Sequence, residues 1–118
     1  MSESLLLNLP WPPTVNHYWG QRGKSRFVKR EGLLFRVAVL AEFRRVRHRG
    51  FGLSRLRVDI VACPPDKRRR DLDNLGKAVC DAMGHAGAYA DDSQIDDFRI
   101  HRGPLKKGGG LIVELWEM

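Results

Sequence analysis

The chain has 118 residues, 42% of them hydrophobic, which is enough for one hydrophobic core and too many for an intrinsically disordered chain. Lysine and arginine number 21 against 14 acidic residues, a formal net charge of +7, so we expect an acidic partner such as nucleic acid. No apolar run reaches the roughly 20 residues of a membrane helix. The polar, acidic start of the chain also lacks the features of a secretory signal, so we expect a cytoplasmic protein with no membrane association.

Neither the cysteines nor the histidines form a metal-binding motif. Cys63 and Cys80 lie far apart without a C-x-x-C spacing, and the histidines show no zinc-ligand spacing among themselves or with the cysteines. We therefore expect two buried thiols in a reducing cell, with neither a zinc site nor a small-molecule cofactor.

The first thirty residues predict one strand followed by irregular chain. Residues 5–9 are mostly leucine and end at Pro10, which indicates a short strand. A pair of prolines then favours a turn. Residues 17–30 are polar and basic with aromatic residues interleaved, and we interpret them as a mobile arm or substrate loop. A solvated surface loop is the alternative.

Residues 31–48 predict a helix with two apolar stripes. The first stripe comprises Phe35, Val39, Phe43 and Val46, and the second comprises Leu33, Val37 and Leu40. Two stripes indicate burial on two sides, against the core and against a partner subunit, although a central helix of one domain shows the same pattern.

The middle of the chain predicts a strand and a second helix. Residues 53–63 alternate apolar and polar side chains, which is typical of a half-buried strand, and two prolines end it. Residues 72–86 carry an apolar face at helical spacing. Asp71 or Asp73 is placed to cap the start of this helix, and Gly87 follows its end as a C-terminal glycine.

Residues 95–101 and 111–116 predict two further strands, which we expect to form an antiparallel pair. The complete order is β-α-β-α-β-β, within a single domain that spans residues 1–118. We predict an α/β (α+β) fold in which a mixed sheet of about four strands packs with two main helices.

The most informative segment joins a run of positive charges to a group of acids. In chain order it contains Lys67, Arg68, Arg69, Arg70, Asp71, Asp73 and Lys77, and a second acidic pair follows at Asp91 and Asp92. Cations attract a phosphate backbone, whereas carboxylates bind a hard divalent ion, so the combination predicts a metal-dependent site that acts on nucleic acid. We predict that the basic run binds DNA together with Lys24 and Arg26.

Each of these acids also has an ordinary structural explanation. Aspartates cap helices, and Asp73–Lys77 and Lys77–Asp81 have the i, i+4 spacing of pairs on a helix surface. The combination favours a metal site, because converging carboxylates repel one another unless a cation lies between them. Asp71 and Asp73 face the same side if their segment is extended. The second acidic pair joins them if the turn after the helix doubles back.

Two or three aspartates suit Mg²⁺, with Mn²⁺ as the alternative ion. Lys77 follows Asp73 by one helical turn, so its ammonium group is placed to stabilise the negative charge that develops on a scissile phosphate.

These residues resemble the signature of the RusA family of Holliday-junction resolvases. The resemblance rests on the string Arg69-Arg70-Asp71-Leu72-Asp73-Asn74, on Lys77 and Asp81, and on Asp91-Asp92-Ser93-Gln94-Ile95. Two further matches are Leu9-Pro10-Trp11-Pro12-Pro13 with Asn16, and Lys107-Gly108-Gly109 before the last strand. The resemblance covers nearly the whole chain, and the string Asp-Leu-Asp-Asn-x-x-Lys with a later Asp-Asp is fairly specific.

The resemblance implies a small homodimeric, Mg²⁺-dependent endonuclease that recognises four-way DNA junctions by shape and nicks two strands symmetrically. By matching positions, it implies that Asp71, Asp73 and Asp92 bind the metal, with Asp91 as an alternative ligand. It also implies that Lys77 is the essential lysine.

Arg69 or Arg70 matches the arginine of the family motif, and the family implies a bacterial or phage-encoded protein associated with the nucleoid. Two other functions remain open. The chain is either a non-enzymatic basic DNA-binding protein, whose aspartates only cap helices, or a Mg²⁺ nuclease that acts on flaps and other branched DNA.

Overall fold

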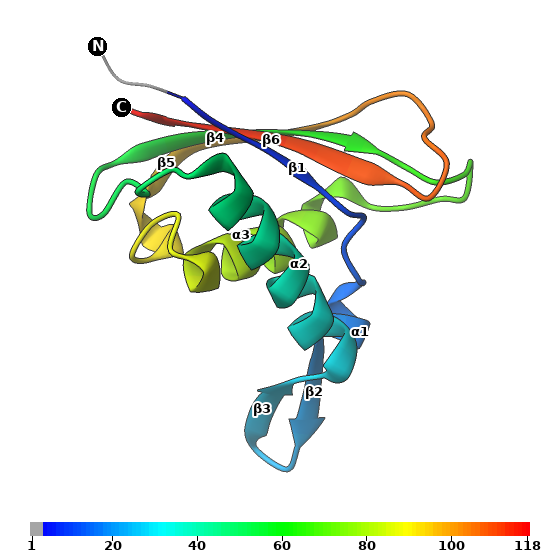
Figure 1. Ribbon diagram of the computed structural model, residues 1–118. Coiled ribbons are helices and arrows are strands. Elements are labelled where there is room, and N and C mark those ends of the chain that lie inside the picture. Colours follow the sequence, from blue (N-terminus) through cyan, green and yellow to red (C-terminus); the bar gives the residue numbers. More distant parts are fainter. Residues whose placement is uncertain (1–3) are drawn as a thin grey trace.

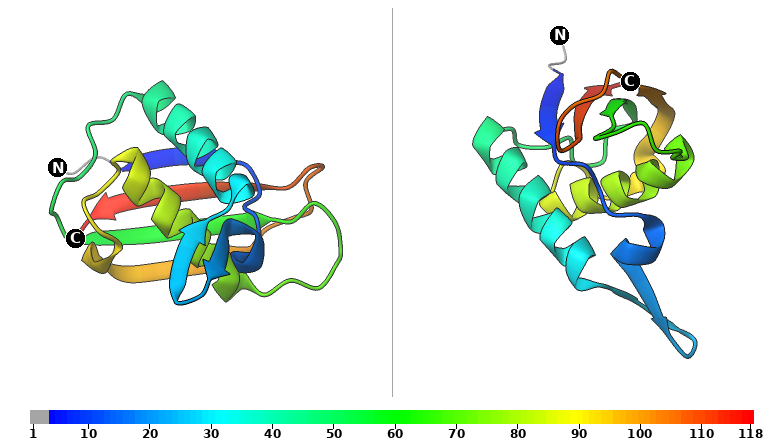
Figure 2. Two further views of the ribbon diagram at one scale, coloured as in Figure 1. Left: turned by 90° about the horizontal axis from the view of Figure 1, so that it is seen from below. Right: turned by 90° about the vertical axis from the view of Figure 1, so that its right-hand side faces the viewer.

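The computed structural model describes residues 4–118, and its centre is a mixed four-stranded sheet. The strands are β1 (Leu5–Leu9), β4 (Leu56–Cys63), β5 (Ile95–Arg102) and β6 (Gly110–Glu117), in the spatial order β1-β6-β4-β5. β4 and β5 run parallel, whereas β6 is antiparallel to both of its neighbours. Helices α2 (Arg30–Val46) and α3 (Leu72–Ala86) cover one face of the sheet (Figure 1, Figure 2). This arrangement confirms the predicted fold class.

The central strand β4 shows why the sheet is buried on one face. Its alternate residues Leu56, Val58, Ile60 and Ala62 are fully buried under the helices, as the apolar period of two predicts. The intervening residues are only partly buried and face away from the helices. The strand ends at Cys63, immediately before the two prolines, because proline has no amide hydrogen to donate to the sheet.

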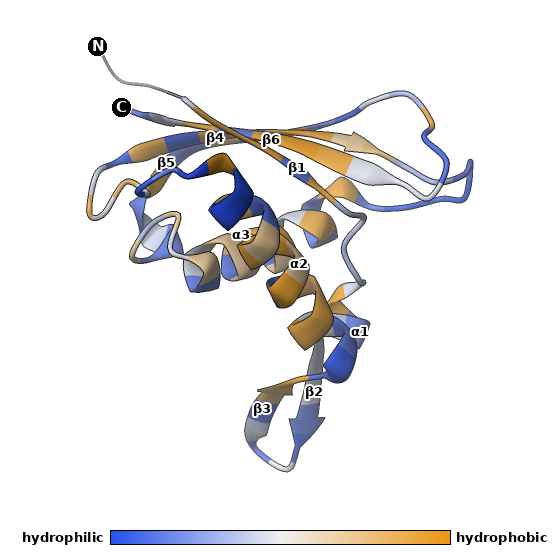
Figure 3. Cartoon of the chain, in the orientation of Figure 1, coloured by the Kyte–Doolittle hydropathy of each residue, from blue (hydrophilic) through white to orange (hydrophobic). Residues whose placement is uncertain are grey.

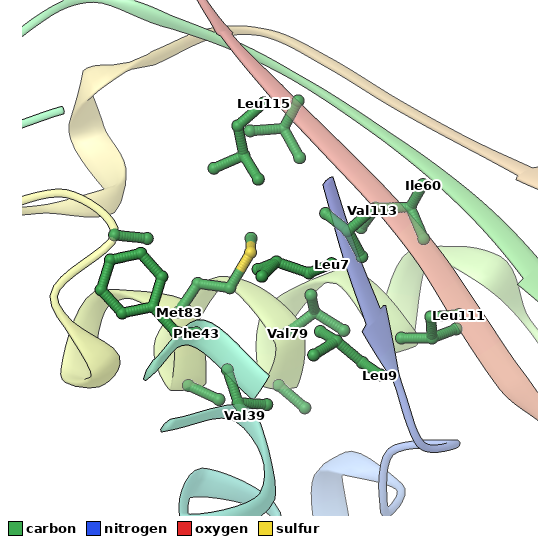
Figure 4. Close-up of a cluster of buried hydrophobic side chains, with 14 of the residues drawn as sticks. Leu7, Leu9, Val39, Phe43, Ile60, Val79, Met83, Leu111, Val113 and Leu115 are labelled. Carbon is green, nitrogen blue, oxygen red and sulfur yellow. The ribbon is translucent and has the colours of Figure 1, made fainter. Parts of the chain in front are cut away.

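A single hydrophobic core fills the space between the sheet and the two main helices. Its labelled side chains converge from β1, β4, β6, α2 and α3 (Figure 4). They are Leu7, Leu9, Val39, Phe43, Ile60, Val79, Met83, Leu111, Val113 and Leu115. Each buried aliphatic side chain of this kind contributes about 1.5–3 kcal/mol. The core therefore holds one face of α3 against the sheet and leaves its opposite face to line a site.

Helix α2 buries only one of its two apolar stripes. Phe35, Val39 and Phe43 belong to the core. In the second stripe Leu33 is 49% exposed and Val37 is 64% exposed, whereas Leu40 is half-buried, so residues 4–118 leave most of this side open to solvent. The hydrophobic colouring is concentrated in the N-terminal half of the helix (Figure 3). The expectation that this side meets a partner subunit therefore stays a prediction.

The predicted bounds of α3 are confirmed at both ends. Gly87 adopts the left-handed conformation at φ 95°, which permits its N–H to close the last turn onto the carbonyls of Met83 and Gly84. Within residues 4–118, neither α3 nor any other helix has the length and apolar character needed to cross a bilayer.

The predicted antiparallel pairing of the last two strands is wrong. β5 and β6 lie on opposite sides of β4 and do not contact each other as neighbours. The connection from β4 through α3 to β5 is a parallel crossover, which places β5 on one edge of β4, and β6 pairs with the other edge. Apolar periodicity identifies a strand but not its neighbours, so the sequence pattern could not give this order.

Residues 17–30 form a β-hairpin rather than the predicted loop. The one-turn helix α1 (Val15–Tyr18) leads into β2 (Trp19–Arg22), and β3 (Ser25–Val28) returns antiparallel to it. Gly23 supplies the φ of 60° that the tight turn requires. The hairpin projects away from the sheet, beyond the helical layer (Figure 1). Its strands are short and largely polar, so they lack the alternating apolar pattern by which strands are recognised.

Candidate active site

A pocket of about 300 Å³ opens between α3 and β5. Its charged side chains are Asp73 and Lys77 of α3, and Asp92 from the one-turn helix η1 (Asp92–Gln94) that precedes β5. The remaining lining residues are Gly76, Cys80, Ile95 and Phe98. The pocket thus joins one residue from each of the two acidic segments that the sequence analysis expected to meet.

The floor of the pocket depends on a close contact between α3 and β5. A Cβ atom at Gly76 would lie 2.9 Å from Cζ of Phe98, so the glycine permits the aromatic ring to pack directly on the helix. Cys80 lies one turn further along. Burial and the charge of Asp92 raise the pKa of its thiol to about 12, which keeps the thiol protonated at neutral pH.

Asp71 does not line this pocket. It occupies the cap position before α3, but its side chain makes no capping hydrogen bond, so the predicted capping role of this carboxylate is wrong. The backbone is extended at Asp71 and helical from Leu72, so the extended segment on which the predicted shared side of Asp71 and Asp73 depends is not present. Residues 4–118 contain no cluster of three or more His, Cys, Asp or Glu side chains with the geometry of a metal site.

Asp91 and Asp92 have different roles in their turn. The Asp91 carboxylate accepts a hydrogen bond from the Ser93 N–H at 2.9 Å, and Gln94 Oε1 accepts the Asp91 N–H at 2.7 Å, which completes a capping box. The hydrogen bonds from Ser93 hold the pKa of the Asp91 carboxyl below its usual range. Asp92, by contrast, lines the pocket with its carboxylate free of the cap.

Lys77 does not make either of the helix-surface pairs that its spacing permits. Within residues 4–118 its ammonium group forms no ion pair with Asp73 or Asp81. Asp81 instead accepts a hydrogen bond from the Tyr18 hydroxyl and an ion pair from Arg36 Nη2 at 2.9 Å. The lysine charge is therefore left available to the pocket.

The basic run after β4 is divided between structural and exposed residues. Arg70 donates to Asp66 Oδ1 at 2.7 Å and lies 5.6 Å above the ring of Trp11, and it lowers the pKa of the Asp66 carboxyl. Lys67, Arg68 and Arg69 are exposed. Of these three, only Arg68 also approaches Asp66, at 3.7 Å between Nε and Oδ2. The run therefore presents cations to solvent directly before the acidic helix start.

The other predicted DNA-binding cations, Lys24 and Arg26, lie on the β2–β3 hairpin. Both are exposed. The hairpin is attached to the body of the protein near α1, whereas the basic run lies in the loop between β4 and α3 (Figure 1). Lys24 and Arg26 therefore form a second group of cations, separate from the basic run.

Sequence reasoning missed two groups of residues that hold the site in place. Gln94 is 5% exposed, and its Nε2 donates to the carbonyls of Gly52 and Ser54 at 2.8 Å, which fixes η1 to the loop after α2. Tyr18 and Arg36 hold α3 through Asp81. Gln94 and Asp81 were part of the quoted motif, but no local pattern indicated what they contact.

An α+β fold with carboxylates and a free lysine in one pocket, beside a row of exposed cations, is typical of nucleic-acid hydrolases. The sequence profile described as endodeoxyribonuclease RusA matches residues 10–115. A crossover junction endodeoxyribonuclease from Enterobacteria phage HK97 is 41% identical over 110 residues, which cover 93% of this chain and 92% of that protein.

Two other relatives with the same enzyme name give the same result. The protein from Escherichia coli is 39% identical over 113 residues, covering 95% of this chain and 93% of the relative. The protein from Enterobacteria phage 82 is 38% identical with the same coverage. The chain belongs to the RusA family of endodeoxyribonucleases.

Proposed function

We propose that this protein is a Mg²⁺-dependent endonuclease that resolves four-way Holliday junctions as a homodimer, by paired symmetric nicks. The junction substrate is the one that the names of its relatives give for them. The observation that carries the chemistry is the meeting of Asp73, Lys77 and Asp92 in one pocket. We place this activity in the bacterial cytoplasm, in a chromosomal or phage-encoded recombination system.

The donor set of the pocket fits a magnesium ion. Magnesium usually binds through one or two carboxylates, keeps several waters and takes a phosphate oxygen of its substrate. Asp73 and Asp92 supply two carboxylates that make no hydrogen bond or ion pair among residues 4–118. Asp71 is the third proposed ligand, at the start of the same helix. Mn²⁺ accepts the same oxygen donors and is the alternative ion.

The proposed reaction is hydrolysis of a DNA phosphodiester by a water that attacks in line, leaving a 5′-phosphate and a 3′-hydroxyl. When bound, the metal ion supplies Lewis-acid stabilisation of the phosphate charge. Lys77 places its ammonium group at the same pocket and offsets the extra negative charge of the transition state. Phe98 and Ile95 supply the apolar part of the pocket lining.

DNA is held beside the pocket by exposed cations. Lys67, Arg68 and Arg69 directly precede α3 and contact the phosphates next to the cleaved bond, whereas Arg70 holds the loop in shape through Asp66. Binding through phosphates is independent of sequence and falls with increasing salt. The hairpin cations Lys24 and Arg26 contact a more distant part of the substrate.

A homodimer explains the paired nicks, because a two-fold symmetric pair of sites matches the approximate two-fold symmetry of a four-way junction. The exposed stripe of α2 is the proposed contact between subunits. Outside this stripe, Leu34 of the same helix is 57% exposed and lines a shallow apolar pocket of about 370 Å³ together with Trp11 and the two prolines that follow it. An apolar surface of this kind on one chain favours burial against a second copy.

The direct test compares Asp73→Asn with Asp97→Asn, which neutralises a half-buried carboxylate that pairs with Arg99 on β5, outside the pocket. Asp73→Asn should abolish cleavage of a four-way junction in Mg²⁺. The junction should remain bound, because the exposed cations Lys67, Arg68 and Arg69 are unchanged. Asp97→Asn should cut as the unmodified protein does. Normal cleavage by Asp73→Asn would show that the proposed pocket is not the active site.

Two other functions give different results in one assay. A non-enzymatic DNA-binding protein would bind a junction with steep salt dependence and leave it uncut in Mg²⁺. A nuclease for other branched DNA would cut a flap at least as fast as a mobile four-way junction. The proposal requires cleavage of the junction in preference to the flap and a linear duplex, with the two nicks placed symmetrically.

A further inference from the structure

The β2–β3 hairpin is held rigidly at its base. The carbonyl of Tyr18 accepts the N–H of Lys29 at 2.8 Å, which closes the two ends of the hairpin. The Tyr18 hydroxyl donates to Asp81 on α3, and Arg36 Nε donates to the same hydroxyl at 3.0 Å. Tyr18 is fully buried. The base of the hairpin, which lies between α1 and α2 in the chain, is therefore joined to α3, the helix that lines the proposed active site.

The hairpin is strongly cationic. Residues 19–30 contain five cations and no acid, namely Arg22, Lys24, Arg26, Lys29 and Arg30. The described part of the chain, residues 4–118, offers none of them an ion-pair partner. A second copy of this protein carries a net charge of +7 and would be repelled by this element. The charge therefore points to a polyanion as the occupant.

Each face of the hairpin carries an arginine beside an aromatic ring. On one face Phe27 lies opposite Gly20, and the Arg22 guanidinium lies 5.7 Å from the centre of its ring. On the other face the Arg26 guanidinium lies 4.2 Å from the ring of Trp19. The two faces together combine flat aromatic surface with positive charge.

Phe27 is the exposed ring of the two pairs. It is 42% exposed, while Trp19 is partly buried against the core. A Cβ atom at Gly20 would lie 2.4 Å from Cζ of Phe27, so the glycine lets one side of the ring lie flat on the backbone and leaves the other side to solvent. A surface hollow of about 530 Å³ lies alongside, and Asn16, Gln21 and Lys29 supply its polar lining.

We propose that the hairpin is a base-stacking arm, in which Phe27 stacks on a nucleobase displaced from the helical stack at a DNA branch point. The hairpin cations hold the phosphates on either side of that base. Aromatic side chains next to cations are the general means by which proteins bind unstacked bases without regard to sequence. This inference rests on the proposed function, because it assigns to the arm the recognition of the branched substrate.

The arm lies on the appropriate side of the molecule for this role. It projects beyond the helical layer on the side where α3 and β5 lie, as the two views in Figure 2 agree. A linear duplex keeps every base stacked, whereas a four-way junction exchanges stacking partners at its centre. The arm therefore provides discrimination between the two, in addition to the attraction of phosphates that both share.

The test measures binding of the unmodified protein and its variants in the absence of divalent metal, where no cleavage occurs. Phe27→Leu should weaken binding to a four-way junction roughly tenfold and leave binding to a linear duplex unchanged, because stacking on one base is lost. Phe27→Tyr should restore junction binding. Leu105→Ala, a change at an exposed apolar residue outside the hairpin, is the matched control and should affect neither DNA.

A second reading uses 2-aminopurine, whose fluorescence reports unstacking, at the branch point of the junction. Its signal should change on binding of the unmodified protein and of Phe27→Tyr, but not of Phe27→Leu. Equal loss of junction and duplex binding by Phe27→Leu, or no loss on either, would overturn the inference. Junction cleavage by the unmodified protein in Mg²⁺ is scored separately, so failure of the proposed function is distinguished from failure of the arm.

Discussion

The Tyr18 hydroxyl donates a hydrogen bond to the Asp81 carboxylate, and this bond joins the base of the hairpin to the middle of α3. The two residues are 63 positions apart in the chain. Asp81 lies one turn after Lys77 on the same helix. Arg36 of α2 completes the contact with an ion pair at 2.9 Å, so three helices meet at one half-buried carboxylate. This relationship fixes the orientation of the helix that carries the proposed active-site residues Asp73 and Lys77.

Tyr18→Phe should lower the free energy of unfolding by about 1–3 kcal/mol, since it keeps the ring in place but removes both hydrogen bonds of the hydroxyl, the one donated to Asp81 and the one accepted from Arg36. Burial, together with the hydrogen bond to Asp81, raises the pKa of Tyr18 to about 12 from its ordinary value of 10.0. A raised pKa contributes stability that is fully present below pH 10 and is lost as the pH rises through about 12.

Denaturant unfolding between pH 8 and 12 checks this expectation. The free energy of unfolding of the unmodified protein should exceed that of Tyr18→Phe below pH 10, and this difference should fall as the pH rises from about 10 to about 12. Tyr89 is present in both proteins, so the difference between them isolates Tyr18. A constant difference across that window would show that the pKa of Tyr18 is not raised.

Lys77→Ala should lower kcat for junction cleavage by about 10²–10³-fold, which is the usual effect of removing one group that stabilises transition-state charge. Its effect on KM and on junction binding should be small, because Lys67, Arg68 and Arg69 retain the phosphate contacts. Lys107→Ala, at an exposed lysine near the last turn, serves as the control. Single-turnover kinetics separate the two quantities, and unchanged kcat would show that Lys77 is only a surface charge.

Asp91 and Asp92 should behave differently when each is changed to asparagine. Asp92→Asn should raise the Mg²⁺ concentration required for cleavage by tenfold or more, because a charged oxygen donor is lost from the pocket. Asp91→Asn keeps an oxygen that can accept the Ser93 N–H, so it should retain the metal requirement with a modest fall in Tm. Mg²⁺ titrations of the cleavage rate compare the two. A larger increase in the required Mg²⁺ concentration for Asp91→Asn than for Asp92→Asn would show that Asp91 is the metal ligand.

Val37→Glu should dissociate the proposed dimer, because it places a charge in the centre of the exposed stripe of α2. We expect at least a tenfold weaker association by analytical ultracentrifugation, and a shift from paired to single nicks. Val37 is 64% exposed, so the fold of the single chain should be unaffected. A dimer of unchanged stability would exclude this side of α2 as the contact.

The elements predicted from sequence are those with a strong local pattern. The apolar face of α3 gave both of its bounds, and the alternating residues of β4 gave its end at Cys63 but placed its start at residue 53 rather than at Leu56. One buried face imposes its period on each of these elements. The hairpin was missed because its strands are short and largely polar, and because Phe27 packs on Gly20 of the hairpin itself rather than on the core. The strand that pairs with β5 was predicted wrongly because the periodicity of one segment does not show which other strand it pairs with.

The site was predicted only in part for the same reason. Asp73 and Lys77 follow from helical spacing alone, and the pocket brings Asp92 to them. That approach depends on Gln94. Its side-chain amide donates hydrogen bonds to the carbonyls of Gly52 and Ser54, which lie 42 and 40 positions earlier in the chain. Asp71 was expected on the same side as Asp73 if their segment was extended, but the backbone becomes helical at Leu72, so that condition is not met.

The central claim is that Asp73 and Asp92 hold a divalent ion beside Lys77. The most direct measurement is a crystal structure with Mn²⁺ in place of Mg²⁺, in which anomalous scattering locates the ion. We predict one anomalous peak within about 2.0–2.3 Å of a carboxylate oxygen of each aspartate, and its loss in Asp73→Asn. A peak at other carboxylates, with the pocket between α3 and β5 empty, would contradict the account.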